Sequence, residues 1–442
     1  MSRHIRVAIG RAARKHAWQA VATVALLASL LVMSSPVGAS DAVLEWNQIA
    51  FAATVTAAQG PLPQTRSMTI VQISMHDSVN GVTGDYRTYF SIGAAPWGAS
   101  AEAAAIAAAH RALVGLFPAQ ASALNAARAT SLAAHELTDT DPGIVFGEFV
   151  AAAVLSARSS DGSAQAQFAY IAAGAGAPGV WTPVGADQAL LPGWRHVKPW
   201  VLQDATQFAP ADPPILQGKR YARDYTEVQE VGSLTSATRT AEQTEIARFW
   251  LATPASIWND VARQVIQARK LDLSATARAF ALVYLATADA GITCWNAKYA
   301  FNVWRPITAI RNGDLDGNDR TVADPDWAPL FPTPQHPEYV SGHSTNSSAM
   351  ATMLTLLFGD DPGVAIVASS PTNPGFQRHW ATFNEGIDEV IDARIYSGAH
   401  YRTSNEEGAR LGREIARFVM EHALGSSKGS AKEGAGYGDR TR

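Results

Sequence analysis

The sequence predicts an all-α protein, and three observations support this fold class. Apolar residues make up 47% of the 442-residue chain and charged residues only 17%, which is enough apolar surface for one large core or two ordinary ones. Beyond the first forty residues, the apolar residues recur at the three- and four-residue spacing of a buried helix face. The long alternation of apolar and polar residues that indicates β-strands is missing from the sequence.

The first forty residues form a separate segment. A basic start precedes an apolar run of 14 residues, Ala20–Met33, and the small-residue ending Val37-Gly38-Ala39 is typical of a signal-peptidase site. A spanning helix needs roughly 20 apolar residues, so this run is too short for a stable membrane anchor. We therefore expect residues 1–39 to be a cleaved signal peptide and the mature protein to be secreted or periplasmic.

The chain without this leader is acidic. It contains 30 basic and 39 acidic residues, a net charge of −9. This charge offers no basic surface for nucleic acid, and any anion site has to be a local cluster of cations. The single cysteine, Cys294, excludes an internal disulfide and a cysteine-based zinc site.

The expected helices follow one another along residues 40–424, which we take as one all-α domain. Helical spacing from Leu44 to Gly81 is interrupted at Gly60-Pro61, which predicts two helices joined by a turn. The alanine-rich stretch Ala99–Ala134 contains Pro118 and predicts a second pair. Further helices are expected at Ala237–Ala252, Ile257–Lys270, Ser274–Asn302, Thr345–Phe358, Glu385–Arg394 and Asn405–Leu424.

Two stretches are expected to lack helices. The segment Ala172–Gly218 is rich in Gly, Pro and Trp, and it is either a lid over a functional site or a loop that wraps the bundle. The segment 425–442 is rich in Gly, Ser and Lys, which predicts a disordered tail.

The residues with chemical potential concentrate in the last third of the chain. Lys298 and Arg305 are seven residues apart, so on one helix both cations would project from the same face. Pro306 follows directly, which disfavours helical geometry at Arg305 and would end or kink the helix there. The tripeptide Ser341-Gly342-His343 precedes a helical run, where backbone N–H groups at the helix start form a cradle for an anion.

A third group of residues completes this set. Arg394 and His400 are six residues apart, about 120° from a common helix face, and Ser397-Gly398 predicts a break that turns both inward. Three cations, a hydroxyl, a glycine amide and two histidines suit a tetrahedral oxyanion with several negative charges.

The order and spacing of these residues resemble the three signature motifs shared by the vanadium-dependent haloperoxidases and the type 2 phosphatidic-acid phosphatases (PAP2). The matching residues are Lys298-x6-Arg305-Pro306, Ser341-Gly342-His343 and Arg394-x5-His400. The upstream segments Leu44–Asn80, Val180–Pro214 and Thr235–Ile246 resemble the secreted bacterial haloperoxidase-like branch. The resemblance implies the helical-bundle fold of that superfamily, with a catalytic part at about residues 274–424.

The resemblance also implies a role for each residue. His400 would be the axial ligand of a vanadate cofactor, and His343 would be the acid or base beside it. The equatorial oxygens would be held by Lys298, Arg305, Ser341, the Gly342 amide and Arg394. The implied activity is the oxidation of a halide by hydrogen peroxide to a hypohalous acid equivalent. The alternative is a PAP2-type acid phosphatase that hydrolyses phosphomonoesters through a phosphohistidine on His400.

The sequence departs from the family pattern beside this histidine. Ser404 stands where the family often has an aspartate that orients the histidine. Metal-bound histidines normally need such a partner, so we expect Asn405, Glu406 or a backbone carbonyl to orient His400.

Two residues give conflicting indications of the halide. His336 lies five residues before Ser341, where the resemblance associates histidine with bromoperoxidases, whereas Trp295 is more similar to the chloroperoxidase pattern. An imidazole raises polarity and can be cationic at mildly acidic pH, while chloride oxidation needs the drier wall. We therefore expect bromide and iodide as substrates. In the alternative interpretation, His336 is a solvated loop residue.

Overall fold

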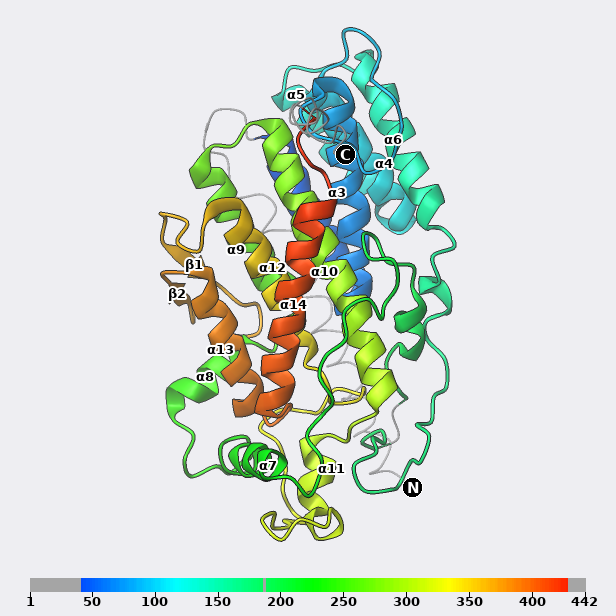
Figure 1. Ribbon diagram of the computed structural model, residues 1–442. Coiled ribbons are helices and arrows are strands. Elements are labelled where there is room, and N and C mark those ends of the chain that lie inside the picture. The colour runs from blue at the N-terminus through cyan, green and yellow to red at the C-terminus, as the bar shows by residue number, and fades with distance from the viewer. Residues whose placement is uncertain (1–40, 186–187, 428–442) are drawn as a thin grey trace, which may run out of the picture. The chain divides into compact units, whose positions relative to one another are not determined.

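The computed structural model describes residues 41–185 and 188–427, and the regular secondary structure of this part of the chain is almost entirely helical (Figure 1). The predicted signal peptide lies outside the described residues. The all-α fold class is confirmed, since the described strands are limited to the antiparallel pair β1 (Ile366–Ala368) and β2 (Arg378–Trp380). The α-helices are α2 (Ala42–Thr56), α3 (Pro61–Thr83), α4 (Ala101–Leu116), α5 (Ala121–Ala134), α6 (Pro142–Arg158), α7 (Lys219–Val231), α8 (Ala241–Phe249), α9 (Pro254–Arg269), α10 (Leu273–Phe301), α11 (Pro306–Arg311), α12 (Gly342–Phe358), α13 (Phe383–Tyr396) and α14 (Arg402–His422).

Most of the expected helices are present, with small shifts at their ends. The two predicted pairs correspond to α2 with α3 and α4 with α5, and the six later predictions correspond to α8, α9, α10, α12, α13 and α14. Three helices, α6, α7 and α11, were not predicted. Helix α7 is rich in charged residues and α11 has only six residues, so neither has a long apolar pattern.

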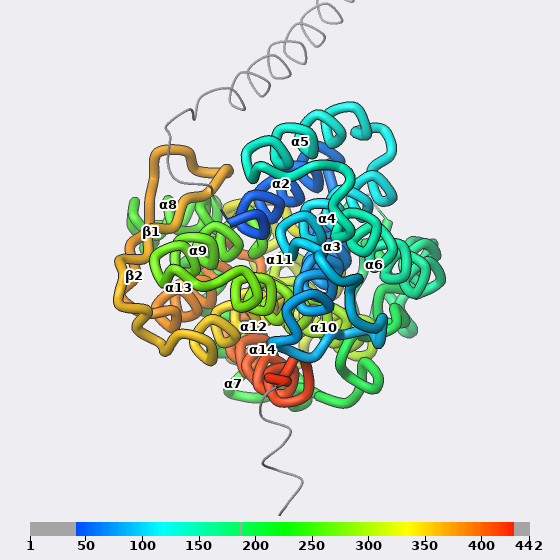
Figure 2. The backbone as a smooth tube through the Cα atoms, turned by 90° about the horizontal axis from the view of Figure 1, so that it is seen from above, coloured from blue at the N-terminus to red at the C-terminus, as the bar shows by residue number. Residues whose placement is uncertain are grey.

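Helix α10 lies at the centre of the bundle. It packs against α3, α12 and α14, and these four helices lie side by side in both views (Figures 1 and 2). Because neighbours cover it on all sides, most of its 29 residues are buried. No helix in the described part of the chain combines the length and apolar character needed to cross a membrane.

Helices α12 and α14 approach each other closely through glycine. A Cβ atom on Gly412 would lie 2.2 Å from the carbonyl oxygen of Thr345, and one on Gly408 would lie 2.8 Å from that of Ser341. A larger residue would push the two helices apart. The glycines therefore hold the start of α12 against α14.

The long loop before α7 is attached to α10. The buried carboxylate of Asp289 accepts hydrogen bonds from the backbone N–H groups of Trp200, Val201 and Leu202, at 2.7, 2.8 and 3.0 Å. Trp181, Trp194 and Trp200 are buried in the core. This loop therefore wraps the bundle, which is one of its two predicted roles.

The last described residues pair with the segment that follows α3. The carbonyl oxygen of Gly425 accepts a hydrogen bond of 2.9 Å from the N–H group of Arg87. The predicted disordered tail begins at Gly425, yet Gly425 and Ser427 form backbone hydrogen bonds with Arg87 and Asp85. The first three residues of the predicted tail are therefore ordered. Residues 428–442 lie outside the described residues.

Candidate oxyanion site

Lys298 and Arg305 reach the same chain segment from different backbone positions. Lys298 lies in the last turn of α10 and is fully buried, and its Nζ donates to the carbonyl oxygens of Pro337 (2.9 Å) and Glu338 (3.0 Å). Arg305 is not on that helix: α10 ends at Phe301, and Arg305 is extended, with φ −79° and ψ 155°. The expectation that both project from one helix face is therefore wrong.

The helix ends at the predicted position, where Asn302 adopts a left-handed conformation with φ 51°. Arg305 still converges with Lys298, because its Nε donates to the carbonyl oxygen of His336 at 2.8 Å. The segment 336–338 is thus the surface on which both cations are anchored.

Ser341, Gly342 and His343 form the start of α12, as the sequence predicts. Ser341 is the N-cap, and its Oγ accepts hydrogen bonds from the N–H and hydroxyl groups of Ser344. A Cβ atom on Gly342 would lie 3.4 Å from the Trp295 ring and 3.9 Å from Cε of Lys298. The N-terminus of α12, where amide groups attract anions, therefore lies beside the lysine.

Arg394 and His400 are brought together by the break that the sequence predicts. Helix α13 ends at Tyr396, and Gly398 has a φ of +73°, which allows the chain to turn back. The N–H groups of Ala399 and His400 then bond to the carbonyl oxygen of Arg394, at 3.1 and 3.3 Å. Arg394 and His400 are both buried, at 3% and 1% exposure.

Glu338 orients His400, and the sequence reasoning missed it. Its Oε1 lies 2.8 Å from Nδ1 of His400 and accepts a second hydrogen bond from the N–H group of Tyr401 at 3.1 Å. The expected partners do not do this: Asn405 bonds to Ser344 and Tyr401, and Glu406 pairs with Arg220. One signal was present, since Glu338 is the only carboxylate in the sequence between Asp326 and Asp360.

This contact fixes which nitrogen of His400 carries a proton. A carboxylate accepts the Nδ1 proton, so Nε2 of the neutral ring has a free lone pair. That nitrogen lies 3.2 Å from Nη1 of Arg305, which can only donate. A carboxylate on Nδ1 and an unprotonated Nε2, which here accepts from Arg305, are the usual arrangement of a metal-binding imidazole.

The buried charges of the site do not balance. Lys298, Arg305 and Arg394 are three buried cations, and Glu338 is the one buried carboxylate in contact with this group among the described residues. Burial lowers the pKa of Lys298 to about 7 and raises that of Glu338 to about 7, so these two groups gain or lose their opposite charges together. Burial also lowers the pKa of Arg305 to about 10 and that of Arg394 to about 9. Buried charges without partners are costly, so the site calls for an anion of about two negative charges.

Arg394 gives the most direct sign of a missing partner. Its Nη1 donates to the carbonyl oxygen of Trp250 at 3.2 Å, but its buried Nε has no hydrogen-bond partner. Buried N–H groups are nearly always paired in folded proteins. A bound oxyanion would provide the acceptor.

A cavity of about 440 Å³ adjoins these residues. Arg394, His400, Gly342 and His343 line it on the polar side. The opposite walls are apolar and include Leu62, Leu190, Leu191, Pro254 and Pro334. The loop that wraps the bundle therefore also contributes a wall through its two leucines.

His343 is placed at the polar side of the cavity. Its Nε2 lies 3.2 Å from the carbonyl oxygen of Ala252, which can only accept, so this nitrogen carries the proton and Nδ1 is available as a base. Burial, followed by the charge of Arg394, holds the pKa of His343 well below 6.5. The histidine is thus neutral and ready to accept a proton.

His336 and Trp295 lie together in the cavity wall. Their ring centroids are 4.9 Å apart, and Nη2 of Arg305 donates to Nδ1 of His336 at 2.9 Å. His336 is 8% exposed, so the interpretation as a solvated loop residue is wrong. Burial, then the charges of Lys298 and Arg305, hold its pKa well below 6.5. His336 is therefore neutral at mildly acidic pH, and the expectation that it can be cationic there is wrong.

The residues fit a vanadate group. Among the described residues, no cluster of three or more His, Cys, Asp or Glu is arranged to hold a bare metal ion. The site instead offers one imidazole lone pair, three cations, a helix N-terminus and an unpaired guanidinium N–H. Fold and site together define a helical-bundle protein with a buried site for a multiply charged oxyanion.

Comparisons with known proteins agree with this description. Residues 278–429 match the family model described as the VCPO second helical-bundle domain. A vanadium chloroperoxidase of Curvularia inaequalis is 31% identical over 178 residues, which cover 33% of this chain and 29% of that protein. The chain thus matches less than a third of the length of this relative.

Solved structures with the same fold extend the likeness to most of the chain. A bacterial vanadium-dependent iodoperoxidase superposes with a TM-score of 0.75 at 24% identity, covering 89% of this chain and 99% of that one. A holo-type bacterial vanadium-dependent chloroperoxidase gives a TM-score of 0.68 at 18% identity, with coverages of 88% and 99%. The resemblance to the vanadium haloperoxidases is therefore confirmed, by sequence over residues 278–429 and by fold over most of the chain.

Proposed function

We propose that this protein is a vanadate-dependent haloperoxidase, an enzyme that oxidises bromide or iodide with hydrogen peroxide to a hypohalous acid equivalent. The observation that carries the proposal is the buried excess of positive charge beside an unprotonated imidazole nitrogen in a largely apolar cavity. The haloperoxidase names of the related proteins support it.

Each residue of the site would have its own role in binding the vanadate group. His400 would bind the vanadium through Nε2, and Glu338 holds that ring in the required tautomer. The oxyanion oxygens would be held by Lys298, Arg305, Ser341, the Gly342 amide and Arg394. Vanadate supplies, when bound, a Lewis-acidic centre that activates hydrogen peroxide for a two-electron oxidation.

His343 and the apolar walls complete the chemistry. Nδ1 of His343 would take the proton that peroxide releases on binding and later return it to the departing oxygen. The walls formed by Trp295, Leu190 and Leu191 exclude water, which strengthens each charge interaction in the cavity.

One experiment separates this function from the phosphatase alternative, which would use the same residues. The protein stripped of oxyanions is assayed with bromide plus peroxide and, separately, with a phosphomonoester, each with and without added vanadate. A haloperoxidase gains bromide oxidation on addition of vanadate. Phosphomonoester hydrolysis that vanadate inhibits, without bromide oxidation, would instead establish the phosphatase.

The preference for bromide and iodide over chloride rests on His336. Its buried imidazole makes one wall of the cavity polar, and chloride, which holds its water more strongly, benefits from a drier wall. We expect wild type to have little chloride activity and His336→Phe to raise the chloride-to-bromide rate ratio. His379→Phe is a matched control, because His379 is exposed on β2 and does not line the cavity. A His336→Phe ratio equal to that of wild type would remove this residue from halide selection.

We also propose that the protein is exported, on the basis of its leader sequence. N-terminal sequencing of secreted material should give a start at Ser40. A membrane-bound product that retains Met1 would refute export with cleavage.

A further inference from the structure

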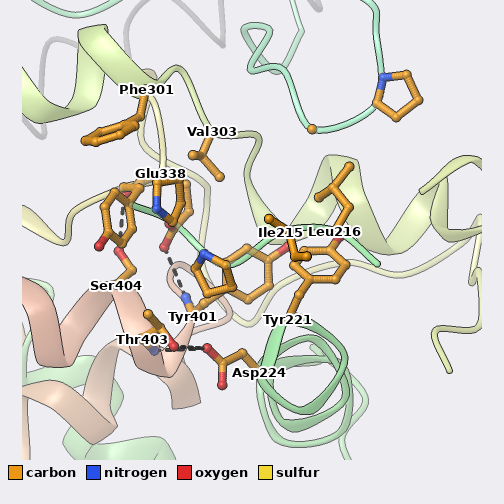
Figure 3. Close-up of a pocket in the computed structure, with 15 residues that line it drawn as sticks. Ile215, Leu216, Tyr221, Asp224, Phe301, Val303, Glu338, Tyr401, Thr403 and Ser404 are labelled. Atoms are coloured by element: carbon orange, nitrogen blue, oxygen red, sulfur yellow. Dashed lines mark hydrogen bonds between the residues drawn. The ribbon is translucent and has the colours of Figure 1, made fainter. Parts of the chain in front are cut away.

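A second cavity, of about 320 Å³, is lined by Glu338 (Figure 3). Its walls come from α7, from the loop residues 178–179 and 213–216, from the segment 301–303 and from the start of α14. It shares no lining residue with the cavity at the oxyanion site. Glu338 lines this cavity and His400 lines the other, so their hydrogen bond forms the partition between the two.

Three polar atoms on the wall of this cavity lack a full set of hydrogen-bond partners. Oε2 of Glu338 is buried and makes no hydrogen bond, and the buried hydroxyl groups of Tyr221 and Tyr401 interact with each other but have no partner of good hydrogen-bond geometry. The three residues are only 1%, 4% and 5% exposed. A buried carboxylate oxygen without a partner is rare, and together with two hydroxyl groups that can each accept a further hydrogen bond it indicates a ligand that supplies donors.

The charge on the cavity wall selects the ligand. The charged side chains that line it in the described part of the chain are both carboxylates, Asp224 and Glu338. Lys298 and Arg305 lie behind Glu338, where their donors are directed at backbone carbonyls and at the histidines of the oxyanion site. An unpaired carboxylate oxygen requires an N–H or O–H donor, and a cation satisfies it best.

Aromatic rings form much of the remaining wall. Tyr221, Tyr339, Tyr401 and Phe301 line the cavity, and the rings of Tyr221 and Tyr401 are 5.9 Å apart. Aromatic faces attract cations, and tyrosine hydroxyls can accept from an ammonium group. Burial raises the pKa of Tyr221 and of Tyr401 above the ordinary value of 10, so both remain neutral phenols.

We propose that this cavity binds a protonated amine on a compact apolar or aromatic body. The ammonium group would donate to Oε2 of Glu338 and to the Tyr221 hydroxyl, and the body would pack between the rings and the proline-rich loop. The volume is at the lower end of the range for small-molecule sites, which favours a compact ligand. Ile215 lines the cavity and is 72% exposed, so the cavity reaches solvent there. This proposal does not rest on the haloperoxidase activity.

Calorimetry on the full-length protein tests the proposal with two probes of equal shape. Benzylamine is a protonated amine at neutral pH, and benzyl alcohol is its uncharged counterpart. Benzylamine should bind at least about tenfold more tightly than benzyl alcohol, because its donor is charged. Absence of benzylamine binding at millimolar concentration, which is the result for a cavity that holds only water, would overturn the proposal. Equal affinities for the two probes would overturn it as well.

A pair of tyrosine variants places the binding in this cavity. Tyr221→Phe removes one hydroxyl acceptor and should weaken benzylamine binding about two- to tenfold. Tyr225→Phe is the control: it lies one turn further along α7, its ring contacts that of Tyr221, and its hydroxyl bonds to Val322 and Ile310 outside the cavity. Tyr225→Phe should leave the affinity unchanged. Equal losses in both variants, or no loss in Tyr221→Phe, would place the amine elsewhere.

Discussion

Replacing Arg394 with methionine should stabilise the protein without vanadate and weaken its stabilisation by vanadate. Arg394 is buried, has no carboxylate partner and leaves its Nε without a hydrogen bond. Methionine has a similar length and no charge, so it fills the space without the cost of burying a cation. The expected gain in stability thus reveals an arginine kept for ligand binding.

The size of this gain follows from the pKa of the guanidinium. Burial lowers that pKa from 12.5 to about 9, which corresponds to about 5 kcal/mol of destabilisation of the charged form at neutral pH. The variant also loses the hydrogen bond to the carbonyl oxygen of Trp250, at a cost of about 1–3 kcal/mol. The free energy of unfolding should therefore rise by about 2–4 kcal/mol.

Thermal unfolding with and without micromolar vanadate measures both effects. A ligand that binds the folded state raises the melting temperature, and this rise should shrink in Arg394→Met because hydrogen bonds to charged groups contribute about 1.5–3 kcal/mol. Arg158→Met is the matched control. Arg158 is equally buried but pairs with Asp161 and donates to the carbonyl oxygens of Lys198 and Pro199.

The control should show the opposite pattern. Arg158→Met leaves a buried carboxylate with fewer partners, so it should lower stability by about 3 kcal/mol while the vanadate-induced shift stays that of wild type. If Arg394→Met instead loses stability and keeps the full vanadate shift, the arginine is a structural residue and the assignment of the oxyanion site fails.

Two further predictions concern the histidines and the response to pH. His400→Ala should abolish the vanadate-induced rise in melting temperature, whereas His343→Ala should keep it and lose about 10²–10⁴-fold in bromide oxidation rate; the reverse pattern would exchange their roles. Burial raises the pKa of Asp289 from 3.8 to about 6, so the folded state binds the Asp289 proton more tightly than the unfolded state does. The stability that this proton contributes is present at pH 4 and is lost as the pH rises through 6. Urea unfolding at pH 4 and pH 7 should show that wild type loses about 3 kcal/mol more than Asp289→Asn across this interval. Equal changes in the two proteins would exclude Asp289 as the cause.

The sequence predicted those parts of the fold and site that depend on local signals. Helix breaks are marked by Gly60-Pro61 and by Ser397-Gly398, and both predictions succeeded because turn residues act on their own backbone. The end of α10 was also predicted, because the expected helix Ser274–Asn302 stops where α10 does. The prediction of a common helix face for Lys298 and Arg305 failed, since Arg305 lies beyond this end in the extended conformation that the following Pro306 favours.

The role of Glu338 could not be predicted from local signals. Its contact with His400 joins residues 62 positions apart and depends on the close approach of α12 and α14. The family pattern directed attention to Ser404, whose hydroxyl instead lies 3.4 Å from the carbonyl oxygen of Glu338. The carboxylate that contacts the imidazole therefore comes from position 338 and not from position 404.

The anchoring contacts of the oxyanion site also have a consequence for the order of folding. The contact of Lys298 with Pro337 spans 39 positions, that of Arg305 with Ala399 spans 94, and that of Arg394 with Trp250 spans 144. Contacts this distant in sequence form late, because long loops close only after local helices have formed. A refolding chain should therefore regain its helical circular dichroism before it can capture vanadate, and the moment of capture marks the completion of the native topology.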